Sequence, residues 1–121
     1  MGWNRLENFK QVGDIVAASA RKPQLIFKHS TRCSISEAAK YRLDADLDGL
    51  KSVCDVHYLD LLSYRDISKL VAERFDVVHQ SPQVILVKGG RPVYVRSHYD
   101  INARELMSKA SSPEQGTAAN S

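Results

Sequence analysis

Apolar residues recur along this chain with two periods, one typical of helices and one typical of strands. Spacing of three and four residues predicts helices over about 4–20, 35–47 and 64–75. Runs rich in β-branched and aromatic residues predict short strands over 24–28, 53–59, 84–87 and 92–96. Asp48-Gly49 is the expected stop of the second helix.

The last part of the pattern predicts a hairpin and one more helix. Lys88-Gly89-Gly90-Arg91 separates the final two strands and is typical of a tight turn. Ser97 stands three residues before Asp100, a capping-box-like pair that predicts a helix start. The predicted order is therefore a helix followed by β-α-β-α-β-β-α.

This order predicts an α/β fold of the thioredoxin-like type. Two parallel strands joined by a helix, followed by an antiparallel hairpin, give a four-stranded mixed sheet with helices on both faces and an extra N-terminal helix. In that fold a reactive cysteine follows the first strand and a cis-proline precedes the hairpin, and Cys33 and Ser81-Pro82 occupy these places. We expect one such domain over 1–110 and a disordered tail over 111–121.

Composition agrees with one globular domain and argues against nucleic-acid and membrane partners. The 121 residues are 43% hydrophobic and 26% charged, with a net charge of +3. No stretch interleaves aromatic with basic residues, so we expect no nucleic-acid partner. No apolar run approaches the ~20 residues that span a bilayer, and no leader-like start is present. We therefore expect no membrane partner and a cytoplasmic location, where cysteines are more often chemical than cross-linking.

Cys33 is the candidate reactive residue because it opens a predicted helix. A helix N-terminus carries unpaired N–H groups and a partial positive charge, which stabilise a thiolate relative to a thiol. Lys28, His29 and Arg32 would add positive potential, and the hydroxyls of Ser34 and Ser36 could donate to the sulfur. The supporting residues of the active turn are His29, Thr31, Arg32, Ser34 and Ser36.

The second cysteine, Cys54, has the opposite character. It lies on the apolar face of its predicted strand, at the other pole of the sheet from Cys33, which is too far for a disulfide. Ser36 stands where a Cys-x-x-Cys motif would have its second cysteine. The site is therefore predicted to be monothiol, with an external thiol completing any cycle. No Cys and His cluster has ligand spacing, so we expect no metal site.

Candidate substrate-binding residues flank the proline and the predicted last helix. They are His79, Ser81, Pro82, Ser97 and His98. For His79 and His98 a binding role and a structural role are equally open, and His57 is better explained as structural. Free N–H groups at the last helix start, with Ser97, could hold a carboxylate.

Four stretches together resemble the monothiol bacilliredoxins of the YtxJ family. They are FKHSTRC (27–33), DVHYLDLL (55–62), HQSPQ (79–83) and SH (97–98), and the resemblance spans about 6–107. It implies a thioredoxin fold, bacillithiol as a thiol co-substrate with no bound cofactor, and Cys33 as the reacting residue. The chain departs from the family at Ser34, where the family has proline.

The resemblance implies a thiol-disulfide oxidoreductase that removes bacillithiol from capped client proteins, with bacillithiol or another redoxin as reductant. Two other classes stay open. One is a binding or sensing module whose Cys33 accepts a thiol cap without turnover. The other is cluster or metal carriage by two chains, which is disfavoured because the Cys-Gly-Phe-Ser turn typical of such carriers is absent.

Overall fold

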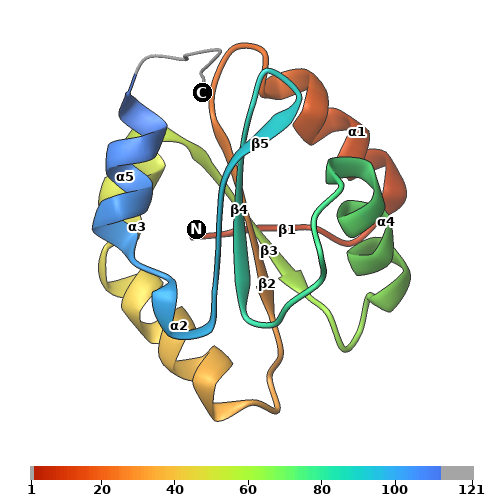
Figure 1. Cartoon of the computed structure of the whole chain (residues 1–121), viewed down its shortest axis with the longest axis vertical. Coiled ribbons are helices and arrows are strands. Elements are labelled where there is room, and N and C mark those ends of the chain that lie inside the picture. The colour runs from red at the N-terminus through yellow and green to blue at the C-terminus, as the bar shows by residue number, and fades with distance from the viewer. Residues whose placement is uncertain (1, 113–121) are drawn as a thin grey trace.

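The computed structural model describes residues 2–112, which form a mixed sheet with helices on both faces (Figure 1). The strand order is β1-β3-β2-β4-β5. The three strands β1, β3 and β2 are mutually parallel, and the hairpin strands β4 and β5 are antiparallel to their neighbours. Their bounds are β1 Asn4–Arg5, β2 Gln24–His29, β3 Asp55–Asp60, β4 Gln83–Lys88 and β5 Arg91–Ser97.

The helices divide between the two faces and enclose two cores. In Figure 1, α2, α3 and α5 lie to the left of the sheet, and α1 and α4 lie to the right. Leu25 and Phe27 of β2 face the first group, and Ile26 faces the second, as the strand period of two requires. The helix bounds are α1 Phe9–Ala18, α2 Ser34–Ala45, α3 Leu47–Val53, α4 Arg65–Phe75 and α5 Ala103–Ser111, with a short 3-10 helix η1 at His98–Asp100.

The predicted thioredoxin-like sheet is confirmed, but it has five strands within the described residues rather than four. The added strand, β1, pairs Asn4 with His57 and Arg5 with Tyr58. It lies where the predicted first helix began, because that helix starts only at Phe9. Asn8 caps it in a capping box with Gln11. A two-residue strand is too short to show any period.

The second predicted helix does not end at Asp48-Gly49. It breaks at Asp46, and α3 continues through Gly49 to Val53. A side-chain Cβ at Gly49 would lie 2.7 Å from Met107 Sδ of α5. Glycine here lets α3 pack closely on α5 without displacing the Met107 side chain, and it does not end the helix.

The predicted final helix start at Ser97 is wrong. Ser97 makes no side-chain capping bond, and only the three-residue η1 follows it. The helix α5 starts at Ala103, where the Asn102 side chain accepts a hydrogen bond from the Glu105 N–H. It includes Ser111, the first residue of the predicted tail, and the tail positions 113–121 lie outside the described residues.

The predicted hairpin is confirmed at Gly89 and Gly90, which join β4 to β5. Both have positive φ angles, 58° and 79°, a conformation that glycine adopts without steric penalty.

Candidate active site

One end of the sheet gathers the segments that carry the candidate residues. The carboxyl ends of β2 and β3 lie there, as does the amino end of β4, because Lys28 of β2 pairs with both Leu59 and Gln83. Ser97 at the end of β5 pairs with Gln83. The turn 30–33, the loop 76–82 and Ser97-His98 therefore share this end, which is the lower end of the sheet in Figure 1.

Cys33 is the N-cap residue of α2 and is partly exposed. Its N–H donates to the Ser30 carbonyl oxygen at 3.3 Å, and its own carbonyl accepts from the Glu37 N–H at 2.9 Å. No side chain caps the helix. The amides of the first turn of α2 are therefore available beside the sulfur, where they favour an anion.

Ser36 is completely buried and is bonded to the strand end rather than to the sulfur. The Ser30 N–H donates to Ser36 Oγ at 2.9 Å, and that oxygen lies 2.7 Å from His29 Nδ1. His29 Nε2 faces Glu37 Oε2 at 3.5 Å. With the ring hydrogen on Nε2 toward this carboxylate, Nδ1 accepts the Ser36 hydroxyl hydrogen. The expected bond from Ser36 to Cys33 is therefore replaced by one to His29.

His29 and Lys28 do not act as exposed cations beside Cys33. His29 is 1% exposed, and burial lowers its pKa, opposed in part by Glu37, so the ring is neutral near pH 7. Lys28 is buried as well, on the α4 side of the sheet. Of the three predicted sources of positive potential, Arg32 is exposed in the turn. Thr31 and Ser34 are exposed there too.

The loop 76–82 contains the cis peptide Ser81-Pro82, as predicted. Pro82 accepts a hydrogen bond at its carbonyl from the His98 N–H at 3.0 Å, so the structure brings these two candidate residues together. His98 has a positive φ of 57°, which is uncommon outside glycine. The Ser81 hydroxyl is buried without a partner in the described part of the chain.

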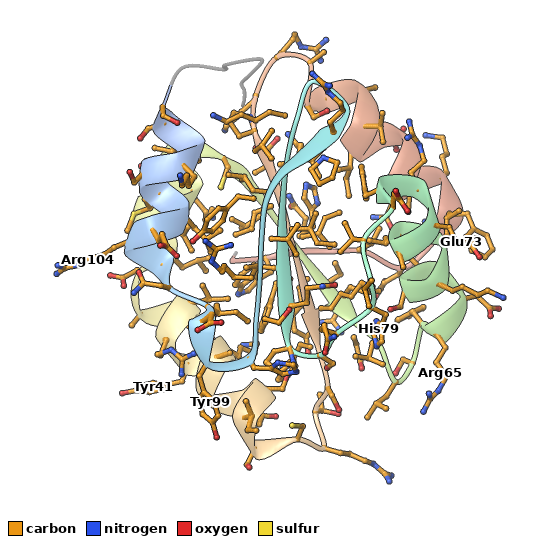
Figure 2. The ribbon with its side chains drawn as sticks, in the orientation of Figure 1. Tyr41, Arg65, Glu73, His79, Tyr99 and Arg104 are labelled. Carbon is orange, nitrogen blue, oxygen red and sulfur yellow. The ribbon has the colours of Figure 1, made fainter. Side chains whose placement is uncertain are left out.

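Lys28 and His79 form a contact that the sequence did not indicate. Lys28 Nζ lies 3.2 Å from His79 Nδ1 and donates to the Ser68 carbonyl oxygen at 3.2 Å. Figure 2 labels His79 beside the loop that joins α4 to β4. The sequence signal was a lysine within a mostly apolar strand, which could have indicated a buried polar contact. Its partners lie 40 and 51 positions away, so the sequence did not identify them.

Cys54 lies at the opposite end of the sheet, as predicted. It follows α3 and precedes Asp55, which pairs with Gln24 at the start of β2. It is 1% exposed, its thiol donates to the Leu50 carbonyl oxygen, and burial raises its pKa to about 12. His57 Nε2 lies 2.7 Å from Gln24 Oε1, which is a structural contact.

Residues 2–112 contain neither a cluster of metal ligands nor a membrane-spanning helix. No group of three or more His, Cys, Asp or Glu side chains is arranged to hold a metal ion there. None of the helices in this part of the chain is long and apolar enough to cross a membrane.

Comparison with solved structures identifies the class of protein. One neighbour, described as a candidate oxidoreductase with a thioredoxin fold, is 28% identical with a TM-score of 0.75, and the match covers 90% of this chain and 93% of that one. The thioredoxin of Malassezia sympodialis is 12% identical with a TM-score of 0.70, covering 92% of this chain and 90% of that one. Fasciola hepatica thioredoxin is 11% identical, also with a TM-score of 0.70, over 89% and 96% of the two chains. The chain therefore has the thioredoxin fold.

The family match is more specific than the match of the fold. The profile of the monothiol bacilliredoxin BrxC matches residues 4–106, so the chain belongs to that family. The bacilliredoxin resemblance of the sequence is confirmed. Family and fold together support a thiol redox function.

Proposed function

We propose that this protein is a monothiol thiol-disulfide oxidoreductase that removes bacillithiol from mixed disulfides on client proteins. The observation that carries the proposal is the contrast between its two cysteines. Cys33 is partly exposed at the start of α2, whereas Cys54 is buried at the far end of the sheet. Ser36 occupies the position of a resolving cysteine and is bonded to His29. One sulfur is therefore available for exchange.

The reaction proceeds in two exchanges. The Cys33 thiolate attacks the bacillithiol sulfur of the mixed disulfide, the bond between the two substrate sulfurs breaks, and the client leaves as a thiolate that takes a proton from water. Cys33 then carries bacillithiol as a disulfide. A second thiol, from free bacillithiol or a partner redoxin, attacks that bacillithiol sulfur as its thiolate. The new disulfide leaves with the bacillithiol, the bond to Cys33 breaks, and the Cys33 thiolate is regenerated.

The proposed substrate site lies along the loop 76–82. Its main chain next to Pro82 would pair with the substrate as an added strand, since Cys33 and this loop share one end of the sheet. His79 and Ser81 belong to this loop. Ser97 and His98 are next to it, because Ser97 pairs with Gln83 and the His98 N–H donates to the Pro82 carbonyl oxygen. Bacillithiol carries a malate group, whose carboxylates would bind among these polar side chains and the free amides of α2.

A second candidate function is a sensing module that accepts a thiol cap on Cys33 without turnover. Ser34, where the family has proline, favours it. Proline fixes its own φ and is suited to the first helical position, so serine changes the stiffness of the turn that presents the sulfur.

Turnover distinguishes the two functions. The protein is incubated at a concentration far below that of the bacillithiol-capped client, with free bacillithiol present. The reduced client is then measured by mass spectrometry. We expect many clients released per protein, none above background with Cys33→Ser, and the parent rate with Cys54→Ser. Release that stops after one equivalent would support the sensor, and release by Cys33→Ser would refute both.

A further inference from the structure

A buried lysine in contact with the loop 76–82 has no acidic partner among the described residues. Lys28 is 0% exposed, and it forms no ion pair within residues 2–112. Its ammonium group contacts the Ser68 carbonyl oxygen and the His79 ring, each at 3.2 Å. Burying an ammonium group without an ion-pair partner costs free energy, and these two contacts offset only part of that cost.

The contact fixes which ring nitrogen of His79 carries hydrogen. An ammonium group donates hydrogen bonds and accepts none, so His79 Nδ1 must be the acceptor. The hydrogen of the neutral ring is then on Nε2. Partial desolvation of the ring lowers the pKa of His79, and the Lys28 charge lowers it further, so the ring stays neutral near pH 7. In a catalytic triad, by contrast, a carboxylate accepts a hydrogen bond from the histidine Nδ1–H, so Nε2 carries no hydrogen and acts as a base.

The loop is tied to β4 as well as to Lys28. Gln83 is 1% exposed, and its Nε2 donates to the Val78 carbonyl oxygen at 3.0 Å. Gln83 pairs directly with Lys28 across the sheet. These two side chains therefore hold residues 78 and 79 at the end of the sheet where Cys33 lies, while His79 itself remains exposed.

We propose that Lys28 is a positioning residue that fixes His79 as an Nε2–H donor, and that this donor binds a carboxylate of the thiol substrate held along the loop 76–82. The inference rests on the proposed function, since it names the substrate group that His79 recognises. A carboxylate accepts such a bond strongly, and the nearby ammonium polarises the ring toward donation.

The test compares two disulfides that react with the same sulfur. One is 5,5′-dithiobis(2-nitrobenzoic acid), which carries carboxylates, and the other is the neutral 2,2′-dithiodipyridine. The ratio of their rate constants at pH 7 cancels changes in the nucleophile. We expect this ratio to fall roughly tenfold in His79→Phe and roughly threefold in Lys28→Met. It should be retained in His79→Gln, which keeps an N–H donor.

Lys69 provides the matched control, because it is exposed on α4 next to Ser68. Lys69→Met removes the same charge without touching His79, and we expect an unchanged ratio. An equal fall in both lysine variants would show general attraction of anions and overturn the inference. An unchanged ratio in His79→Phe, or equal slowing of both disulfides in Lys28→Met, would overturn it too.

A spectroscopic readout is independent of reactivity. Nitrogen-15 NMR of the histidine rings should show hydrogen on His79 Nε2 in the parent. In Lys28→Met, where only the Ser68 hydroxyl remains near Nδ1 at 3.5 Å, the fraction with hydrogen on Nδ1 should rise. Hydrogen on Nδ1 in the parent would refute the assignment. Neither readout uses bacillithiol or turnover. The proposed function can therefore fail while the role of Lys28 and His79 is supported, and that role can fail while the proposed function is supported.

Discussion

Removing the buried hydroxyl of Ser36 should destabilise the protein, whereas removing the exposed hydroxyl of the nearby Ser34 should have little effect. Ser36→Ala deletes an oxygen that accepts from the Ser30 N–H at 2.9 Å and lies 2.7 Å from His29 Nδ1. Alanine fits the space, because it only removes an atom, and it is a better helix former. The change therefore isolates the two hydrogen bonds.

The magnitude follows from what the deletion leaves behind. A buried polar group left without a partner costs about 1–3 kcal/mol. His29 is 1% exposed, so its Nδ1 has no route to water, whereas Ser30 is only partly buried and its N–H can be hydrated. We expect the free energy of unfolding to fall by about 2–3 kcal/mol, most of it from His29.

Urea unfolding at pH 7.5 measures this change. The single tryptophan, Trp3, packs against Phe27 with ring centroids 5.6 Å apart, so its fluorescence reports the core next to the site. Ser34→Ala, exposed at the start of the same helix, is the matched control and should change the free energy by less than about 0.5 kcal/mol. A Ser36→Ala effect as small as the control would refute the reasoning.

Three further predictions concern buried groups. Burial lowers the Lys28 pKa to about 8, so between pH 8 and 10.5 the unfolded state holds a proton that the folded state lacks. The free energy of unfolding of the parent, relative to Lys28→Met, should therefore rise by about 3 kcal/mol from pH 7 to above pH 10. The same pH dependence of the unfolding free energy in both proteins would contradict this. Burial lowers the His57 pKa to about 4, so below pH 6.5 the unfolded state binds a proton that the folded state does not. From pH 7 to pH 4 the free energy of unfolding should fall by up to about 3 kcal/mol more in the parent than in His57→Gln. Equal falls would exclude a buried neutral ring. Burial raises the Cys54 pKa to about 12, so iodoacetamide at pH 7.5 should modify Cys33 alone until denaturant is added, and native labelling of Cys54 in peptide maps would show that it is accessible.

The position of the site could be predicted because local signals defined it. A buried strand followed by a polar turn and a helical period placed Cys33 at a helix N-terminus, and the structure has it as the N-cap of α2. Ser81-Pro82 was identified by its place before the predicted hairpin, and its peptide is cis. Both positions follow from the order of the predicted elements along the chain, so the sequence pattern contains them.

The contacts within the site could not be predicted, because distant residues determine them. Lys28 was interpreted as a source of positive potential near Cys33, but it is buried between β4 and α4, beside Gln83 and Ser68. Gly49 was interpreted as a helix stop, yet it allows α3 to approach Met107. Each of these outcomes depends on packing between elements, which no local period records.

The most direct test of the central claim follows the fate of the bacillithiol cap itself. The protein is mixed with an equal amount of capped client without free thiol, quenched with acid, and measured as intact protein and as peptides by mass spectrometry. The account predicts one bacillithiol on Cys33 for each client released, and a fully capped client with Cys33→Ser. A cap found on Cys54, or a client uncapped by Cys33→Ser at the parent rate, would contradict it.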